Sequence, residues 1–276
     1  MTTKTLANYL GTPATLLDWL ALEFRDHGWS QKHLVRLIIT SSTYRQSSRV
    51  SRELLQRDPE NRLMARASRM RMPSLVLRDT ALAASGLIHL EMGGKPVYPY
   101  QPDDVWETLA ITKERDFTYP ASSGTGLYRR SLYTFWRRTV GPVNMFDASP
   151  RQACRIRAGP TSTPLHALTT LNDITWTEAA RVLAEKAMKA SPERASQITW
   201  AFRRILSRMP TANDLAMLEL CYQKQFMLYS TDAVAASAFL SVGAAPRDSS
   251  LPPAGRAAMS AVCLALFNLD EALTRQ

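Results

Sequence analysis

Apolar residues recur at the three- and four-residue spacing of amphipathic helices over most of the chain. Thr12 and Pro13 are typical of a helix start, and Gly28 of a helix end. A second helix is predicted after Ser30, ending in the polar run 41–45. The two predicted helices are joined by only a few residues, from Gly28 to Ser30, which favours antiparallel packing of the pair. The apolar positions of the pair are Leu16, Leu20, Phe24, Leu34, Leu37 and Ile38.

Three more helices are predicted before residue 111. One opens at Asp58, and the next runs from Pro73 to Gly86. A short one spans 102–110, with acidic residues in its first turn, where they suit the helix dipole. In the first of the three, arginines recur at helical spacing and form what is usually a solvated face. These arginines are Arg62, Arg66 and Arg69.

The stretch from residue 95 to residue 140 breaks the helical pattern. Three prolines between residues 95 and 102 favour extended backbone, and residues 112–126 are polar and predicted to be an exposed loop. Residues 127–140 fit helical spacing, yet their Tyr, Thr, Phe and Trp content favours a strand, which we adopt. A short two-stranded β element is therefore allowed within residues 97–140.

From Thr163 onward the pattern is helical again. Thr163 and Pro164 start a helix, and amphipathic helices follow over 178–189, 192–208 and 212–229. Residues 244–255 are predicted to be a flexible loop before a closing helix. We therefore predict a mainly α fold in which residues 1–276 form one helical domain.

Composition narrows the function classes. The 276 residues include 45% hydrophobic ones, enough for a core, and neither a signal peptide nor a membrane-spanning run is visible. The formal net charge of +10 favours anionic partners. Most of the basic residues are Arg, which a GC-rich genome also produces with Ala. Nucleic-acid binding would follow from charge alone and is not our expectation.

Metal and cofactor sites are not predicted. Cys154, Cys221 and Cys263 show no zinc-ligand spacing and fit small core positions. Asp103 and Glu107, one helical turn apart, could hold a metal with Asp104, but first-turn acids are a common capping pattern. His27 and His33 flank a helix junction and are interpreted as a helix-end charge and a surface residue. The expected cofactor set is therefore empty.

Several strings occur in an order that resembles a known family. They closely resemble the C-terminal domain of unknown function of large planctomycete surface proteins that often carry a cytochrome c-type haem domain. The resemblance implies family membership, an extracytoplasmic location and upstream domains as partners, but no activity. The strings are residues 16–24, 33–48, 93–107, 127–140, 146–154, 161–173 and 267–276.

Two departures from that family change the expectation. Its members read Arg-Arg-x-Arg-Thr-Asn-Thr-Pro where this chain has residues 157–164, so two arginines and an asparagine are missing. An anion held by that basic run in relatives should be held less well here. Relatives also carry an aromatic- and histidine-rich segment ahead of residue 16. We therefore expect this chain to lack its usual upstream segment.

Two places could bind an anionic ligand. Guanidinium forks and flat aromatic faces suit polyanions and sugar rings, and they interleave in one cluster. A core role for its aromatics, with arginines paired locally, is the alternative. A second anion site could form at the helix start at Thr163, with Arg155 and Arg157 just ahead. The cluster comprises Arg129, Arg130, Tyr133, Trp136, Arg137 and Arg138.

For catalysis the best constellation is Asp147, Cys154 and His166, as an acid–base pair with a thiol nucleophile. No spacing shows that these residues meet. The function hypothesis is a non-catalytic binding or assembly module of a larger extracytoplasmic protein, contacting an anionic polysaccharide or another anionic surface. The alternative is part of a polysaccharide-acting hydrolase whose active site is completed by upstream domains.

Overall fold

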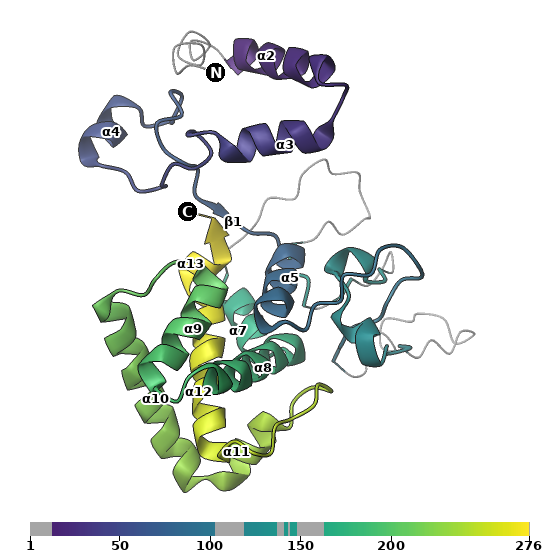
Figure 1. The fold of residues 1–276 in the computed structure, drawn as a ribbon, viewed down its shortest axis with the longest axis vertical. Helices are drawn as coiled ribbons and strands as arrows, with labels where there is room; N and C mark the ends of the chain where they lie inside the picture. The colour runs from purple at the N-terminus through teal and green to yellow at the C-terminus, as the bar shows by residue number, and fades with distance from the viewer. Residues whose placement is uncertain (1–12, 103–118, 137–140, 143, 148–162, 276) are drawn as a thin grey trace. The chain divides into compact units, whose positions relative to one another are not determined.

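The computed structural model describes residues 13–102, 119–136, 141–142, 144–147 and 163–275 (Figure 1). The fold is mainly α-helical, as predicted. Its contacts group the chain into two compact units. The first comprises residues 1–70 with 275–276, and the second comprises residues 71–274.

The first unit carries the helices α2 (Pro13–Asp26), α3 (Gln31–Thr40) and α4 (Arg52–Arg57). The predicted starts of α2 and α3 are confirmed. Ser30 caps α3, because its hydroxyl oxygen accepts from the backbone N–H of His33. Helices α2 and α3 contact each other, which agrees with the predicted helical pair.

The predicted helix from Asp58 through Arg69 is wrong. Helix α4 ends at Arg57, and the Asp58 carboxylate accepts from the backbone N–H groups of Arg62 and Leu63, each at 2.8 Å. The bond from Leu63 is the main cause that lowers the pKa of Asp58. Arg66 donates to the carbonyls of Asp58 and Pro59. These side-chain bonds to the backbone replace the helical ladder.

The second unit is a set of packed helices (Figure 1). Helix α8 packs against α5, α9 and α12, and α12 also packs against α10 and α11. The helices are α5 (Ser74–Ser85), α7 (Pro164–Asn172), α8 (Ile174–Ala190), α9 (Arg194–Leu206), α10 (Ala212–Thr231), α11 (Ala233–Leu240), α12 (Pro253–Phe267) and α13 (Asp270–Leu273). The predicted helices from residue 163 onward are confirmed within a few residues, whereas α11 and α13 were not predicted.

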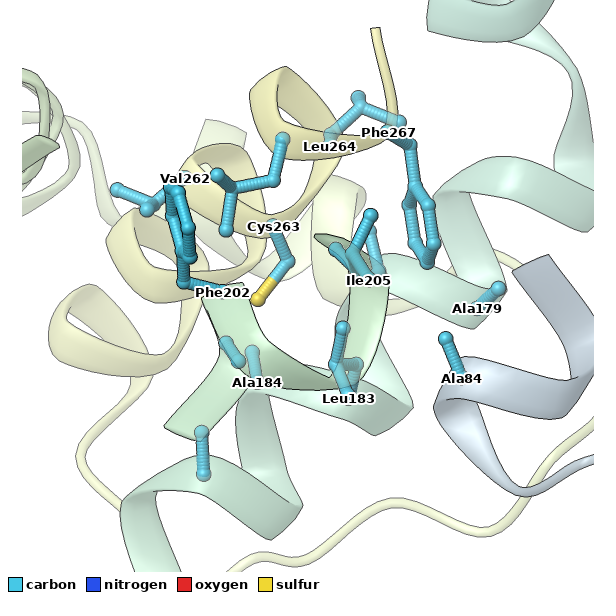
Figure 2. Close-up of a cluster of buried hydrophobic side chains, with 14 of the residues drawn as sticks. Ala84, Ala179, Leu183, Ala184, Phe202, Ile205, Val262, Cys263, Leu264 and Phe267 are labelled. Carbon is cyan, nitrogen blue, oxygen red and sulfur yellow. The ribbon is translucent and has the colours of Figure 1, made fainter. Parts of the chain in front are cut away.

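The core of this unit is an alanine-rich contact between α8 and α12. Ala179, Ala184 and Ala258 are fully buried and let the helices approach closely. Figure 2 shows Cys263 among Phe202, Leu183 and Ala184. Burial raises the pKa of the Cys263 thiol. Its predicted place in the core is confirmed.

The predicted strand at 127–140 is wrong over the described part of that range, and residues 137–140 lie outside it. Instead there are two short 3₁₀ helices, η1 (Gly124–Tyr128) and η2 (Ser131–Tyr133). Among the described residues of 97–140, the expected β element is reduced to an isolated bridge between Val97 and Thr134. The two-stranded sheet lies elsewhere, between β1 (Met70–Arg71) and β2 (Thr274–Arg275).

The loop before α12, predicted to be flexible, is held by side chains of α8, of which Arg181 is buried. Arg181 donates to the carbonyls of Ala245 and Pro246, at 2.8 and 3.2 Å. Lys189 forms an ion pair with Asp248. In the described parts of the chain, no helix has the length and apolar character needed to cross a membrane.

Candidate functional site

Arg129, the first residue of the sequence-predicted basic-aromatic cluster, lies in the interior. Its guanidinium donates to the carbonyl oxygens of Glu91 and Lys95, at 3.0 and 3.1 Å, and also to that of Gly93. The same group lies 4.0 Å from the centre of the Tyr133 ring. In this arrangement Arg129 holds the loop at residues 91–95 against η2.

The other cluster residues are divided between the fold and the surface. The Tyr133 hydroxyl accepts from the backbone N–H of Gly93 at 2.9 Å. Arg130 is half-exposed and lies 3.7 Å from Asp79. The ring of Trp136 lies against Gly141, where an added Cβ atom would come within 2.9 Å of it. Arg137 and Arg138 lie outside the described residues.

The anion site expected at Thr163 can be described only in part. Thr163 has the extended backbone of an N-cap, and Pro164 occupies the first turn of α7, as predicted. The Thr163 side chain makes no capping hydrogen bond. Arg155 and Arg157 lie outside the described residues, as do Asp103, Asp104 and Glu107.

The catalytic constellation is partly brought together. Nδ1 of His166 lies 3.9 Å from Oδ2 of Asp147, and both side chains are 12% exposed. That separation is too long for a hydrogen bond. The Phe146 ring stacks on the His166 ring at 4.1 Å and 15°, and Asp147 has a positive φ of 59°. Cys154 lies outside the described residues.

A surface that sequence reasoning missed lies at the end of α9. Trp200, Arg203, Arg204 and Ser207 line an open hollow of about 330 Å³, which we call the basic hollow. Their spacing of three, four and seven residues places them on one helix face. The guanidinium carbon of Arg204 lies 5.5 Å from the centre of the Trp200 ring. Both arginines are exposed, and Trp200 is half-buried.

The charged residues that line the basic hollow, Arg203 and Arg204, are both positive. Within the described part of the chain, neither Arg203 nor Arg204 makes an ion pair. Arg204 donates to the carbonyl oxygen of Ala84 at 3.3 Å. Lys186 lies close enough for Arg204 to lower its pKa, although burial is the larger cause. The sequence signal was the Trp-x-x-Arg-Arg spacing, which was missed because basic residues are common in a last helical turn.

A second hollow, of about 390 Å³, lies between α9 and α10 and is mixed in charge. Glu193, Arg194 and Glu219 are among its lining residues. Arg194 pairs with Glu219 at 3.1 Å, and its guanidinium covers the Tyr222 ring at 4.0 Å. Its arginine is thus already neutralised, in contrast to those of the basic hollow.

The comparisons with known proteins identify a family whose function is unknown. No curated protein and no solved structure matches the chain. The family described as PSD1, protein of unknown function (DUF1553), matches residues 8–222. Because that match covers most of the sequence, the chain belongs to the PSD1 (DUF1553) family of proteins of unknown function.

Proposed function

We propose that the chain is a non-catalytic binding module that takes an acidic polysaccharide at the basic hollow. One observation carries the proposal: two exposed arginines and a tryptophan line an open hollow, and no carboxylate of the described residues pairs with these arginines. Guanidinium forks match the geometry of carboxylate and sulfate groups, and an indole face can stack on a sugar ring.

The size of the hollow fits this use. At about 330 Å³, it has the volume of a small ligand site, and it is open to solvent. A polysaccharide can therefore place one charged sugar in the hollow and continue along the surface. Each exposed arginine contributes modestly on its own, so affinity would come from several repeated contacts.

The sequence-predicted cluster keeps a smaller part in the proposal. Arg129 and Tyr133 bond to the loop at 91–95, so we do not assign them to the ligand. Arg130 is half-exposed and stays a proposed ligand contact. By resemblance to the planctomycete surface proteins, we further propose that the module serves a larger extracytoplasmic protein whose upstream domains are its partners.

The test is a titration of the chain with sulfated, carboxylated and neutral polysaccharides, at low and high salt. We expect the acidic classes to bind. A double variant, Arg203→Gln with Arg204→Gln, should weaken binding at least tenfold, and so should Trp200→Ala. The matched control, Arg49→Gln with Arg52→Gln, removes the same charge from other exposed positions and should bind within about twofold of the unchanged chain.

Two outcomes would refute the site. The first is a double variant at the basic hollow that binds as well as the control variant. The second is binding that also includes single-stranded DNA and falls steeply with salt for every ligand, because it would reveal attraction by net charge alone.

A hydrolase is the second candidate, and the contact of Asp147 with His166 favours it. An imidazole beside a carboxylate can act as a general base or acid. Release of reducing ends from a polysaccharide, lost in His166→Asn and retained in Trp200→Ala, would support it. If the chain releases no reducing ends from any of the acidic or neutral polysaccharides, a hydrolase site carried by Asp147 and His166 alone is removed.

A further inference from the structure

The turn between α2 and α3 brings one carboxylate and two imidazoles together. Glu23 lies in the last turns of α2, His27 directly follows that helix, and His33 lies in the first turn of α3. One ligand atom from each residue lies within 4.8 Å of the other two. All three residues belong to the first compact unit, so this cluster is separate from the basic hollow.

The backbone of the turn fixes this arrangement. Gly28 and Trp29 both have positive φ angles, of 66° and 59°. The backbone N–H of Trp29 donates to the carbonyl of Phe24 at 2.9 Å, and the two aromatic rings meet edge to face at 5.3 Å. The imidazoles of His27 and His33 stack at 4.0 Å with nearly parallel planes. The turn, and not long flexible side chains, therefore sets the approach of the three groups.

We propose that Glu23, His27 and His33 bind one divalent transition-metal ion, with Zn²⁺ as the reference. Two imidazoles with one carboxylate are a ligand set that zinc takes in proteins, whereas Mg²⁺ prefers oxygen alone. Imidazole also suits copper and nickel. The assignment is therefore to this class of ion.

The distances within the cluster match such an ion. Oε1 of Glu23 lies 3.3 Å from Nδ1 of His27 and 3.3 Å from Nε2 of His33. Two ligand atoms about 2.0–2.1 Å from a tetrahedral ion lie about 3.3–3.4 Å apart. Both nitrogen–oxygen pairs thus have the required separation before any ion binds, and the rings need only tilt so that their lone pairs converge.

Binding of the metal ion requires a change in where the imidazole protons lie. Nδ1 of His27 lies 2.9 Å from the carbonyl oxygen of Glu23, and since a carbonyl only accepts, this nitrogen carries a proton. Coordination through Nδ1 moves that proton to Nε2 of the same ring, a change of tautomer with no net release of a proton, and ends this hydrogen bond. Nε2 of His33, which donates to Oε1 of Glu23 at 3.3 Å, gives up its proton to Nδ1 of its own ring in the same way. The side chains of His27 and His33 are 47% and 37% exposed, so a fourth position on the ion remains open to water.

The ion would tie two elements that otherwise share little packing. Helix α3 has no buried residue. A bridge from the end of α2 to the start of α3 would therefore stabilise this helical pair more than it would a helix packed in a core.

The experiment is isothermal titration of the full chain with ZnCl₂ and, in parallel, with MgCl₂. We expect one Zn²⁺ per chain and no Mg²⁺ binding. His27→Gln, His33→Gln and Glu23→Gln should each weaken Zn²⁺ binding at least tenfold. His89→Gln is the matched control, because His89 also faces a single glutamate, Glu91, at 3.2 Å, and it should bind within about twofold of the unchanged chain.

The variants should keep the fold, because Ser30 caps α3 through the backbone N–H of His33 and not through its ring. Absorption of the chain loaded with Co²⁺ gives a second measurement, since it reports nitrogen coordination directly. The proposal fails if the unchanged chain binds no Zn²⁺. It also fails if the His27 and His33 variants bind Zn²⁺ and Co²⁺ as His89→Gln does.

Discussion

Glu178 is a fully buried carboxylate, and its neighbours supply hydrogen-bond donors to it. Its Oε1 atom accepts from the backbone N–H of Ala245 at 2.6 Å and from the Tyr128 hydroxyl at 3.0 Å. Burial, reinforced by the carboxylate, raises the pKa of Tyr128. A buried charge is tolerated only with such partners. Glu178 is therefore locked in place beneath residues 243–245.

This lock makes Gly243 sensitive to substitution. A Cβ atom there would lie 2.3–2.6 Å from the Glu178 side chain, and the φ of +83° favours glycine. We expect Gly243→Ala to lower the free energy of unfolding by about 3 kcal/mol or more, from strain and overpacking together. Urea denaturation measures the change. Gly124→Ala is the control, since φ is +56° but nothing lies within 4 Å; it should cost about 1 kcal/mol. Equal losses would show that Glu178 yields easily.

At the scale of elements, Arg78 explains how the segment at 124–136 is held without regular pairing. Arg78 is fully buried on α5 and donates to the carbonyls of Leu127 and Arg129, at 2.8 and 3.0 Å. The neighbouring Asp79 accepts from the backbone N–H of Ser131 at 2.7 Å. These bonds satisfy polar groups of η1 and η2 that a strand ladder would otherwise pair.

Removing Arg78 should therefore loosen this segment. We expect Arg78→Met to lower the free energy of unfolding by about 3 kcal/mol, because buried carbonyls lose their donors. The matched control is Arg203→Met, an exposed arginine of the same unit, with an expected loss below about 0.5 kcal/mol. Thermal unfolding of both variants provides the measurement. Similar small losses in both would mean that the segment is held by other bonds.

A comparison of the helices with the segment at 124–136 shows which structure the sequence predicts and which it does not. Caps and apolar spacing were enough for α3, α5 and α10, because Ser30, Gly86 and Thr211 set local backbone geometry. The described part of the segment at 127–140, residues 127–136, was predicted wrongly, since its conformation depends on Arg78, about fifty residues earlier in the chain. A pattern of polar and apolar positions assigns every arginine to the surface, so it cannot predict that Arg78 is buried.

The candidate sites were harder to predict than the helices for the same reason. Arg129 belongs to a recognisable basic-aromatic string, yet its guanidinium bonds to backbone carbonyls at 91–95. No local pattern reveals such a use. Two other contacts also join separate parts of the chain. Asp147 approaches His166, and Glu23 approaches His33, only because the fold brings these parts together.

At the scale of the whole molecule, the two compact units differ in their cores. Among the described residues of the first unit, Asp58 alone is buried. The second unit contains the buried hydrophobic core, which includes Trp176, Phe202 and Met259. Since burial of apolar surface is the main source of stability, the free energy of local opening should differ between the units.

Native-state hydrogen exchange, read by mass spectrometry, tests this difference. We expect amides of α8 and α12 to be protected most strongly, with exchange that requires global unfolding, and amides of α2, α3 and α4 to exchange earlier by opening within their own unit. Added Zn²⁺ should slow exchange in α2 and α3 and leave α12 unchanged if Glu23, His27 and His33 hold the ion. Equal protection of the amides in both units would contradict this prediction. It would mean that the first unit is as stable as the second although it buries far less apolar surface.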